Sequence, residues 1–397
     1  MAFDYSSLLA PQDGITGTWR EIYNPSLSYP ENIDRLLRQV ILLPHDFYDL
    51  VAAYSLLPSA LCRIIPYLFV FGQSGSGKST LTKFIGHIHG VPLDTSGSTF
   101  AGIRNDLDKR RQGWAELPVN DEEERTYNKA VERNTILVWD DIDAGIFMKY
   151  PDLYRMFKFG YDRKTDKIII SSKDVGVNLE FHCFCPKVFS SISPLHLDDR
   201  FKELKRRLIV IPCKRVEELT TERSLELGVT KDNWQSKLID LDLYNWTGFN
   251  HEFEQFWDME TAQSFIQTRD ILSKTVKGLG SQQRTISLDI MACGIATGIW
   301  NDEIEAVTCL SEYWQWFKDE TQKNAGLGQL LKEYLRQEEK NSSLIGTELA
   351  VTTNQIRNQL DIWVYEGWLF ERPRLQQVQD IMLDLGMRLQ KGVWRRG

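Results

Sequence analysis

The sequence predicts an α/β protein whose core is a mostly parallel sheet covered by helices. The first observation is a series of short apolar runs separated by longer polar or helical segments, namely IIPYLFVF, TILVWDD, KIIISS, KVFSSI and RLIVIP. The second is that this alternation is confined to residues 61–216, with helical patterns on both sides. Strands that alternate with helices are typical of a parallel sheet, because the chain must cross the sheet between successive strands.

We expect four regions along the 397 residues. A helical N-terminal region covers 1–60, where ENIDRLLRQVILL and HDFYDLVAAYSLL carry apolar residues at helical spacing. The α/β core covers 61–216 and contains a long polar insertion whose segment DEEERTYNKAVER reads as a solvated helix. A helical region follows over 217–326, and a winged-helix-like domain over 327–397.

The composition is that of an ordinary soluble globular protein. Hydrophobic residues make up 42% and charged residues 26%, and the formal net charge of −8 argues against a uniformly basic nucleic-acid-binding surface. The N-terminal residues do not resemble a secretory signal and the apolar runs are too short to cross a bilayer, so we expect a cytoplasmic protein without membrane contact. Of six cysteines, only Cys183 and Cys185 are close together, and no second pair has zinc-site spacing, so we expect reduced, buried thiols.

The most specific motif is GQSGSGKST, which lies between an apolar strand and an amphipathic helix and satisfies the P-loop pattern. Its glycines allow the backbone N–H groups to curl around a phosphate, and the helix that follows adds the positive end of its dipole. Lys78 would reach the β- and γ-phosphates of ATP, and the Ser79 hydroxyl would ligate Mg²⁺. The predicted nucleotide-binding residues are Gly72, Gln73, Ser74, Gly75, Ser76, Gly77, Lys78, Ser79 and Thr80.

A second candidate element is the pair of carboxylates that ends the run ILVWDD. Asp140 would hold Mg²⁺ through water, and Asp141 would orient or deprotonate the water that attacks the γ-phosphate. Asp143 is an alternative to Asp141. Because Asp is one methylene shorter than the Glu usual at this position, slow turnover is expected.

A third element is the segment FCPKVFSSISPLHLDDRFKELKRRLIVIP, residues 184–212. A buried strand ends in the hydroxyl residues Ser190, Ser191 and Ser193, which can hydrogen-bond a γ-phosphate or a water molecule. A charged helix then leads to Arg206 and Arg207, just before another apolar strand. The basic residues of this helix can equally form a solvated face.

The order of GQSGSGKS, LVWDD, KVFSSISP and KRRLIVIP resembles the AAA+ P-loop ATPases, and within them the superfamily 3 helicase-like ATPases of phage and plasmid primase-helicases. The resemblance covers residues 61–216. It implies that Ser191 or Ser193 senses the γ-phosphate, where this family usually has Asn, and that Arg206 or Arg207 is an arginine finger, with Arg200 as a further candidate.

An arginine finger acts on a neighbouring subunit, so the resemblance also implies a homo-oligomer, such as a hexameric ring. In this family a hairpin near residues 166–180 lines the pore of the ring and touches single-stranded DNA, and Lys173 would be its counterpart. The residues themselves favour a plain surface loop at this place, and the hairpin is the alternative.

The C-terminal domain shows three helical signals, LGQLLKEYLRQE, SLIGTELA and TTNQIRNQLDIWVYEG, and two strand-like pieces, GWLFER and MRLQKGVWRR. Such a module commonly places its third helix in the DNA major groove. Here that helix would present polar side chains to base edges, namely Asn354, Gln355, Arg357, Asn358 and Gln359. Residues 341–397 carry seven Arg and Lys against six Asp and Glu, which leaves structural or protein docking as the alternative.

Three functions are consistent with these motifs. The first is a Mg²⁺-dependent ATPase that moves nucleic acid, that is, a helicase or translocase linked to the replication of a mobile element. The second is a switch that assembles on ATP and recruits an effector protein, for example in defence or transposition. The third and least favoured is a P-loop kinase, because such enzymes are usually smaller and do not need a pair of arginines after a sensor strand.

Overall fold

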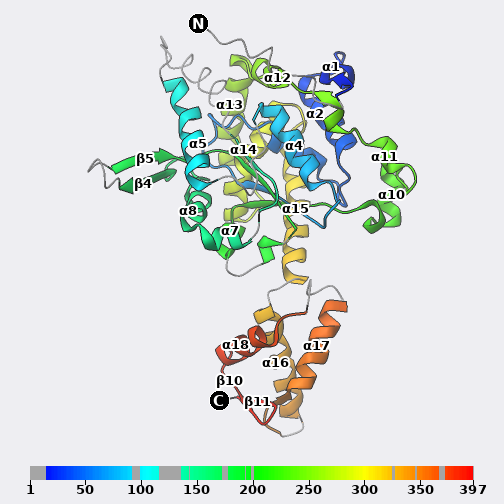
Figure 1. Ribbon diagram of the computed structural model, residues 1–397, viewed down its shortest axis with the longest axis vertical. Coiled ribbons are helices and arrows are strands. Elements are labelled where there is room, and N and C mark those ends of the chain that lie inside the picture. Colours follow the sequence, from blue (N-terminus) through cyan, green and yellow to red (C-terminus); the bar gives the residue numbers. More distant parts are fainter. Residues whose placement is uncertain are drawn as a thin grey trace. The chain divides into compact units, whose positions relative to one another are not determined.

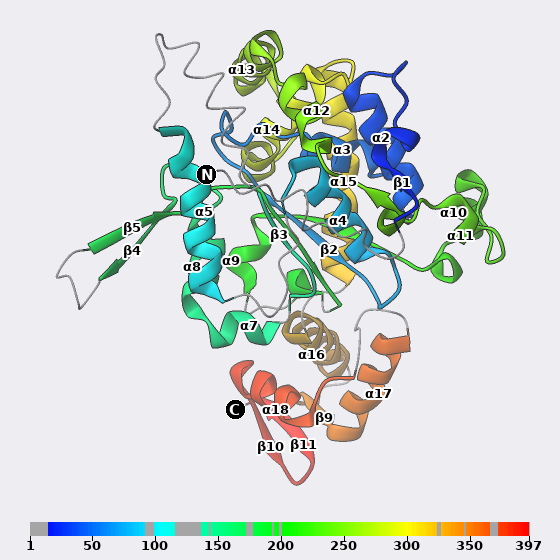
Figure 2. The ribbon, with the colours of Figure 1, turned by 45° about the horizontal axis from the view of Figure 1, so that its top comes forward.

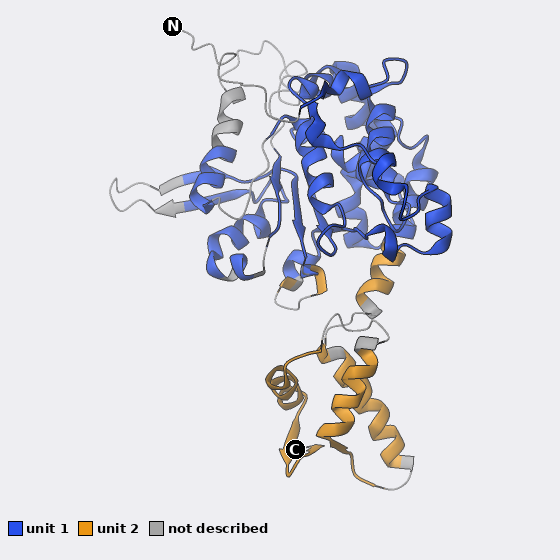
Figure 3. Ribbon diagram, turned by 45° about the vertical axis from the view of Figure 1, so that its right-hand side comes forward, with its two compact units in different colours: residues 1–195, 203–313 blue, residues 196–202, 314–397 orange. Residues whose placement is uncertain are grey.

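The computed structural model (Figure 1) describes residues 15–91, 99–115, 136–142, 144–171, 178–192, 194–197, 201–323, 327–344, 347–365 and 372–396. The chain divides into two compact units, coloured separately in Figure 3. Unit 1 comprises residues 1–195 and 203–313, and unit 2 comprises residues 196–202 and 314–397.

The core of unit 1 is a four-stranded sheet in the order β3-β6-β2-β7. Its strands are β2 (Tyr67–Phe71), β3 (Leu137–Trp139), β6 (Lys187–Ser191) and β7 (Leu208–Pro212). All three pairs of neighbours are parallel, which confirms the predicted α/β class with a mostly parallel sheet. Each strand falls within one of the predicted apolar runs. Because parallel strands end at the same edge, the loops that follow β2, β3, β6 and β7 meet at that edge.

The remaining predicted run, KIIISS, does not join this sheet. It forms β4 (Lys167–Ser171), which pairs in antiparallel fashion with β5 (Asn178–His182). The chain therefore has a hairpin here, and the favoured prediction of a plain surface loop is wrong. Lys173 lies between the two strands, outside the described residues.

Helices cover both faces of the sheet (Figure 2). Helix α4 (Lys78–His89) packs on β2, β3 and β6, and α12 (Phe249–Phe256) and α2 (Tyr29–Val40) pack on α4. On the other face, Phe157 of α8 (Pro151–Phe159) contacts the rings of Tyr67 and Phe189, with centroids 5.5 and 5.1 Å apart. Side chains alternate along each strand, so this two-sided cover accounts for the nearly continuous apolar character of the predicted runs.

The predicted N-terminal helices are present as α2 and α3 (Tyr48–Ser55), and α2 begins with a capping box in which the Ser28 and Glu31 side chains each bond the other residue's backbone N–H. The region after 217 is helical, as expected, and comprises α10 (Thr221–Leu227), α11 (Trp234–Lys237), α12, α13 (Met259–Thr275), α14 (Ser281–Ala296) and α15 (Glu303–Lys323). Shorter or peripheral elements of unit 1 are β1 (Gly17–Thr18), α1 (Trp19–Ile22), α5 (Phe100–Ala115), α7 (Ala144–Lys149), α9 (Lys202–Lys205) and β8 (Tyr244–Asn245). The insertion helix predicted over 121–133 lies outside the described residues.

Tyr313 of α15 binds one backbone N–H of β7, the strand at one edge of the sheet. Its hydroxyl accepts a hydrogen bond of 2.6 Å from the backbone N–H of Val210 in β7. The Tyr313 side chain is completely buried.

The described residues of unit 2 include the end of α15, from Trp314, three further helices and a small antiparallel sheet in the order β10-β11-β9. The helices are α16 (Leu327–Leu344), α17 (Thr353–Tyr365) and α18 (Leu375–Asp384), and the strands are β9 (Ala350–Thr352), β10 (Met387–Gln390) and β11 (Val393–Arg396). The segment SLIGTELA is not helical over residues 347–350, because the chain there extends into β9, whose Val351 is fully buried in the core. Helix α18 was missed, although Val378 and Met382 repeat at helical spacing and are buried.

The cysteines are free thiols; Cys309 is half-buried and the other five are buried, as expected. Among the helices that the structure describes, none combines the length and apolar character that a bilayer crossing requires.

Candidate functional site

The glycine-rich loop connects β2 to α4 and is packed tightly at both ends. A Cβ atom on Gly72 would lie 2.1 Å from the backbone oxygen of Cys213, and one on Gly77 would lie 2.4 Å from Cδ1 of Ile41. Gly77 also has a φ of +86°, which side chains disfavour. The motif therefore needs glycine at these two places for steric reasons that are visible in the fold.

Two polar side chains of the loop, those of Ser76 and Lys78, are buried. Lys78 is 7% exposed, and its Nζ donates a 2.8 Å hydrogen bond to the backbone oxygen of Gln73. Burial lowers the pKa of Lys78 from its usual value. The buried Ser76 hydroxyl has no hydrogen-bond partner among the described residues. A phosphate oxygen is a suitable acceptor for both groups.

Asp140 and Asp141 follow β3 at the same edge of the sheet, and Ser190 bonds the carboxylate of the first and the backbone N–H of the second. The Ser190 hydroxyl donates a 2.5 Å hydrogen bond to Oδ1 of Asp140 and accepts one of 2.9 Å from the backbone N–H of Asp141. The backbone oxygen of Ser190 also accepts from the N–H of Ile142, at 2.7 Å. Asp141 has a positive φ of 56°, uncommon for a residue with a side chain. The chain thus turns sharply after Asp140, and Ser190 fixes that turn.

Of the predicted hydroxyl residues, Ser190 bonds the Asp140 carboxylate and the Asp141 backbone N–H. Val138 pairs with Val188, so Asp140 and Ser190, each two residues further on, lie on the same face of the sheet. This is the face of α4, since a Cβ on Gly86 would lie 4.0 Å from Val138. Strand alternation places the buried Ser191 side chain on the opposite face.

The two arginines predicted as fingers lie at the other end of β7. Leu208 pairs with Tyr67 and Pro212 with Phe71, so Arg206 and Arg207 precede the end of the strand that is remote from the glycine-rich loop. The Arg207 side chain is 12% exposed; it stacks 4.4 Å from the Tyr161 ring and donates to the backbone oxygen of Glu203. The Arg206 side chain is 60% exposed. Neither arginine therefore belongs to the loop's own site, and only Arg206 is accessible to another molecule.

A single cavity of about 970 Å³ joins the glycine-rich loop to the carboxylates. Its volume is in the range of small-molecule sites. The lining includes predicted residues, namely Ser74, Gly75, Ser76, Gly77, Lys78, Ser79, Thr80, Asp140 and Asp141, together with Ser190. Lys83, Ile192 and the residues at 40–42, 214–217, 234–235 and 238–242 also line it. Gly72, Gln73 and Ser191 are not among the lining residues, although the first two shape the loop.

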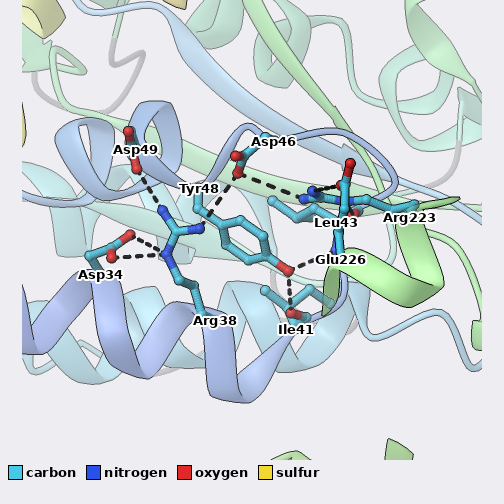
Figure 4. A network of polar contacts seen from close by, with 9 residues as sticks. All are labelled: Asp34, Arg38, Ile41, Leu43, Asp46, Tyr48, Asp49, Arg223 and Glu226. Atoms are coloured by element: carbon cyan, nitrogen blue, oxygen red, sulfur yellow. Dashed lines mark hydrogen bonds and ion pairs between the residues drawn. The ribbon is translucent and has the colours of Figure 1, made fainter. Parts of the chain in front are cut away.

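The rim of this cavity at residues 40–42 is held by a polar network (Figure 4). The Tyr48 hydroxyl donates to the backbone oxygen of Ile41 at 2.9 Å and accepts from the N–H of Leu43 at 3.1 Å. Nε of Arg223 donates to the oxygen of Leu43 at 3.0 Å. On the other side of Tyr48, Arg38 binds three carboxylates, those of Asp34, Asp46 and Asp49. The network ties the N-terminal helices to α10.

The arrangement can accommodate Mg²⁺. Magnesium usually takes one or two protein ligands and completes its shell with water and substrate phosphates. The Ser79 hydroxyl and the Asp140 carboxylate both line the cavity and can supply these ligands, directly or through water. The candidates Asp143, Ser193 and Arg200 lie outside the described residues.

The sequence patterns did not predict the hydrogen bonds from Ser190 to Asp140 and Asp141, the cavity residues within 40–42 and 234–242, or Arg215 at the edge of the loop. Ser190 was one of three predicted hydroxyl residues. Strand alternation relative to Asp140 distinguishes it from Ser191. No local motif marks the other positions, since they reach the cavity only through long-range packing.

The surface predicted to read DNA belongs to unit 2. On α17, Asn354, Arg357 and Asn358 are exposed. Gln355 is also exposed, but its Oε1 accepts from both the N–H and the hydroxyl of Thr352, so it caps the helix. Basic residues are exposed on the β10–β11 hairpin, namely Arg388, Lys391, Arg395 and Arg396, of which Arg396 pairs with Glu339.

Comparison with known protein families finds no family model that matches this chain, and comparison with curated proteins finds no match either.

Proposed function

We propose that the protein is a Mg²⁺-dependent ATPase of the AAA+ type, and that it works as an oligomeric motor on nucleic acid, a helicase or translocase linked to mobile-element replication. The observation that carries the ATPase proposal is the convergence of the GQSGSGKST loop, Asp140, Asp141 and the Ser190 hydroxyl on one cavity. These are the groups that phosphoryl transfer to water requires: a phosphate cradle, a carboxylate for the metal and a carboxylate for the water.

Each residue has a separate task in this reaction. Lys78 exchanges its hydrogen bond to Gln73 for one to a phosphate oxygen and balances the charge that develops there. Asp140 is held by Ser190 and would hold Mg²⁺ through water. Asp141 is exposed at the turn and orients the attacking water. Ser79 and Asp140 would hold Mg²⁺, which would supply positive charge against the negative charge of the phosphates.

Isothermal titration with ATP in the presence of Mg²⁺, together with a phosphate-release assay, tests this proposal. Wild-type protein should bind and hydrolyse ATP, and Lys78→Ala should lose both activities. Lys231→Ala, which removes the same charge from an exposed position that does not line the cavity, should behave like wild type. Hydrolysis retained by Lys78→Ala would refute the ATPase proposal.

Two features support the motor over other uses of ATP. The hairpin β4–β5 occurs where the resemblance to superfamily 3 helicases places a DNA-contacting hairpin. Unit 2 has the elements of a winged helix, with polar residues exposed on α17 and basic residues on its hairpin. A motor of this kind should hydrolyse ATP severalfold faster with single-stranded DNA, and this stimulation should weaken as salt increases.

The alternative is an assembly switch that recruits an effector protein, and the exposed Arg206 is compatible with both. Imaging with a slowly hydrolysed ATP analogue, with and without single-stranded DNA, separates them. A ring that encloses the strand supports the motor. ATP-dependent assembly that DNA neither joins nor stimulates supports the switch.

A further inference from the structure

The segment that follows strand β7 runs directly along the glycine-rich loop. The N–H of Cys213 donates to the backbone oxygen of Phe71 at 2.7 Å. The backbone oxygen of Cys213 lies 2.1 Å from the position that a Cβ on Gly72 would take. Two residues later, Nε of Arg215 donates a 2.9 Å hydrogen bond to the backbone oxygen of Ser74. The parallel pairing of β2 with β7 therefore delivers a cationic side chain onto the loop of the same chain.

The guanidinium of Arg215 forms no ion pair with a carboxylate of the described residues. Its backbone N–H, in contrast, donates to Oε2 of Glu218 at 3.0 Å, which begins the short helical turn Val216–Glu218. The side chain is exposed and lines the same cavity as Lys78. Arg215 thus keeps its two terminal NH₂ groups available beside the phosphate loop.

Arg215 and Lys78 line the same cavity, and both side chains bond the backbone of the glycine-rich loop, Arg215 at Ser74 and Lys78 at Gln73. Two cations that repel each other across a cavity bind an anion placed between them more strongly than either does alone. Lys78 is the residue expected to reach the β- and γ-phosphates.

We propose that Arg215 contacts the terminal phosphates of ATP bound to its own subunit, and that it favours ATP over ADP. This inference rests on the proposed ATPase function. A guanidinium can bind two phosphate oxygens at once, and its hydrogen bond to Ser74 holds it at the loop before the nucleotide arrives. Part of the positive charge that neutralises the terminal phosphates then comes from the same chain. This contribution does not depend on an arginine finger from a neighbouring subunit.

The test compares binding of a slowly hydrolysed ATP analogue and of ADP by calorimetry in the variants Arg215→Ala and Arg215→Gln. Both variants should bind the ATP analogue about 10- to 100-fold more weakly, the range for loss of a charge-assisted hydrogen bond. Binding of ADP should change about threefold or less. Arg215→Gln retains an N–H donor for Ser74 without the charge, so it isolates the contribution of charge. Lys231→Ala is the matched control and should bind both nucleotides like wild type.

Three results would overturn the inference. The first is unchanged preference for the ATP analogue in both variants. The second is an equal loss for both nucleotides, which would mean that Arg215 only shapes the loop. The third is recovery of hydrolysis when Arg215→Ala and Lys78→Ala proteins are mixed, because an arginine that acts across an interface would be supplied by the second protein. If wild-type protein binds neither nucleotide, the ATPase proposal itself fails, and this outcome is distinct from all three.

Discussion

Replacing Ser190 by Ala removes one hydroxyl that makes two hydrogen bonds, to the Asp140 carboxylate at 2.5 Å and from the Asp141 N–H at 2.9 Å. A hydrogen bond to a charged group contributes about 1.5–3 kcal/mol, and one between neutral groups about 0.5–1.5 kcal/mol. Asp141 is exposed, so water can replace the bond to its N–H, and the net loss is about 2 kcal/mol. If this loss falls on the transition state for hydrolysis, kcat falls roughly 30-fold.

The assay is steady-state phosphate release at several Mg²⁺ concentrations, with urea unfolding as a control for folding. Ser190→Ala should have the reduced kcat and should require more Mg²⁺ for half-maximal rate, because Asp140 is no longer held. Ser191→Ala is the comparison, since its side chain lies on the other face of the sheet. If Ser191→Ala lowers kcat while Ser190→Ala does not, the assignment of the sensing hydroxyl to Ser190 is wrong.

Three other predictions concern the surroundings of the site. Arg207→Ala should lower the free energy of unfolding by about 2 kcal/mol, because the variant loses a cation–π contact and a hydrogen bond. Arg206→Ala should leave the free energy of unfolding unchanged. Equal urea midpoints for the two variants would contradict this. The pKa of His87 is lowered to about 4, chiefly by burial, so the folded state resists protonation that the unfolded state accepts near pH 6.5. Stability should therefore be highest above pH 6.5 and should fall by roughly 3 kcal/mol as the pH drops to 4, while His87→Gln removes this dependence. Gly72→Ala should destabilise the protein by about 1–3 kcal/mol and abolish ATP binding, and calorimetry that shows tight binding by this variant would disprove the close contact with Cys213.

The parallel core could be predicted because each of its strands corresponds to one short, continuous run of the sequence. Each of β2, β3, β6 and β7 coincides with a largely apolar run, since a strand that is buried on both faces is built mostly from apolar residues. The polar residues at those ends, Lys78 and Asp140 among them, then identify the edge where a site forms. Their meeting in one cavity follows from the parallel order of the strands.

The parts that were not predicted depend on pairing and packing over long distances. The choice between Ser190 and Ser191 depends on the register of β6 against β3, which no single-strand pattern contains. Arg215 follows Ser74 by 141 residues in the sequence, and it reaches the loop because β7 lies beside β2. The extended conformation of residues 347–350 similarly depends on pairing of β9 with β11, which outweighs the local preference for a helix.

The hydrogen bond between Tyr313 and Val210 affects whether a strand of another chain can pair with the outer edge of β7. In β7, Arg207 and Cys213 bond to β2, so the alternate residues Val210 and Pro212 face outward from the sheet. Pro212 has no N–H, and the N–H of Val210 is occupied by the Tyr313 hydroxyl. An outer strand with free N–H groups can add a strand from another chain and begin aggregation. At Val210 and Pro212 the strand therefore offers no N–H for such an addition, and Tyr313→Phe, which removes the partner of the Val210 N–H, should make the protein more prone to aggregate.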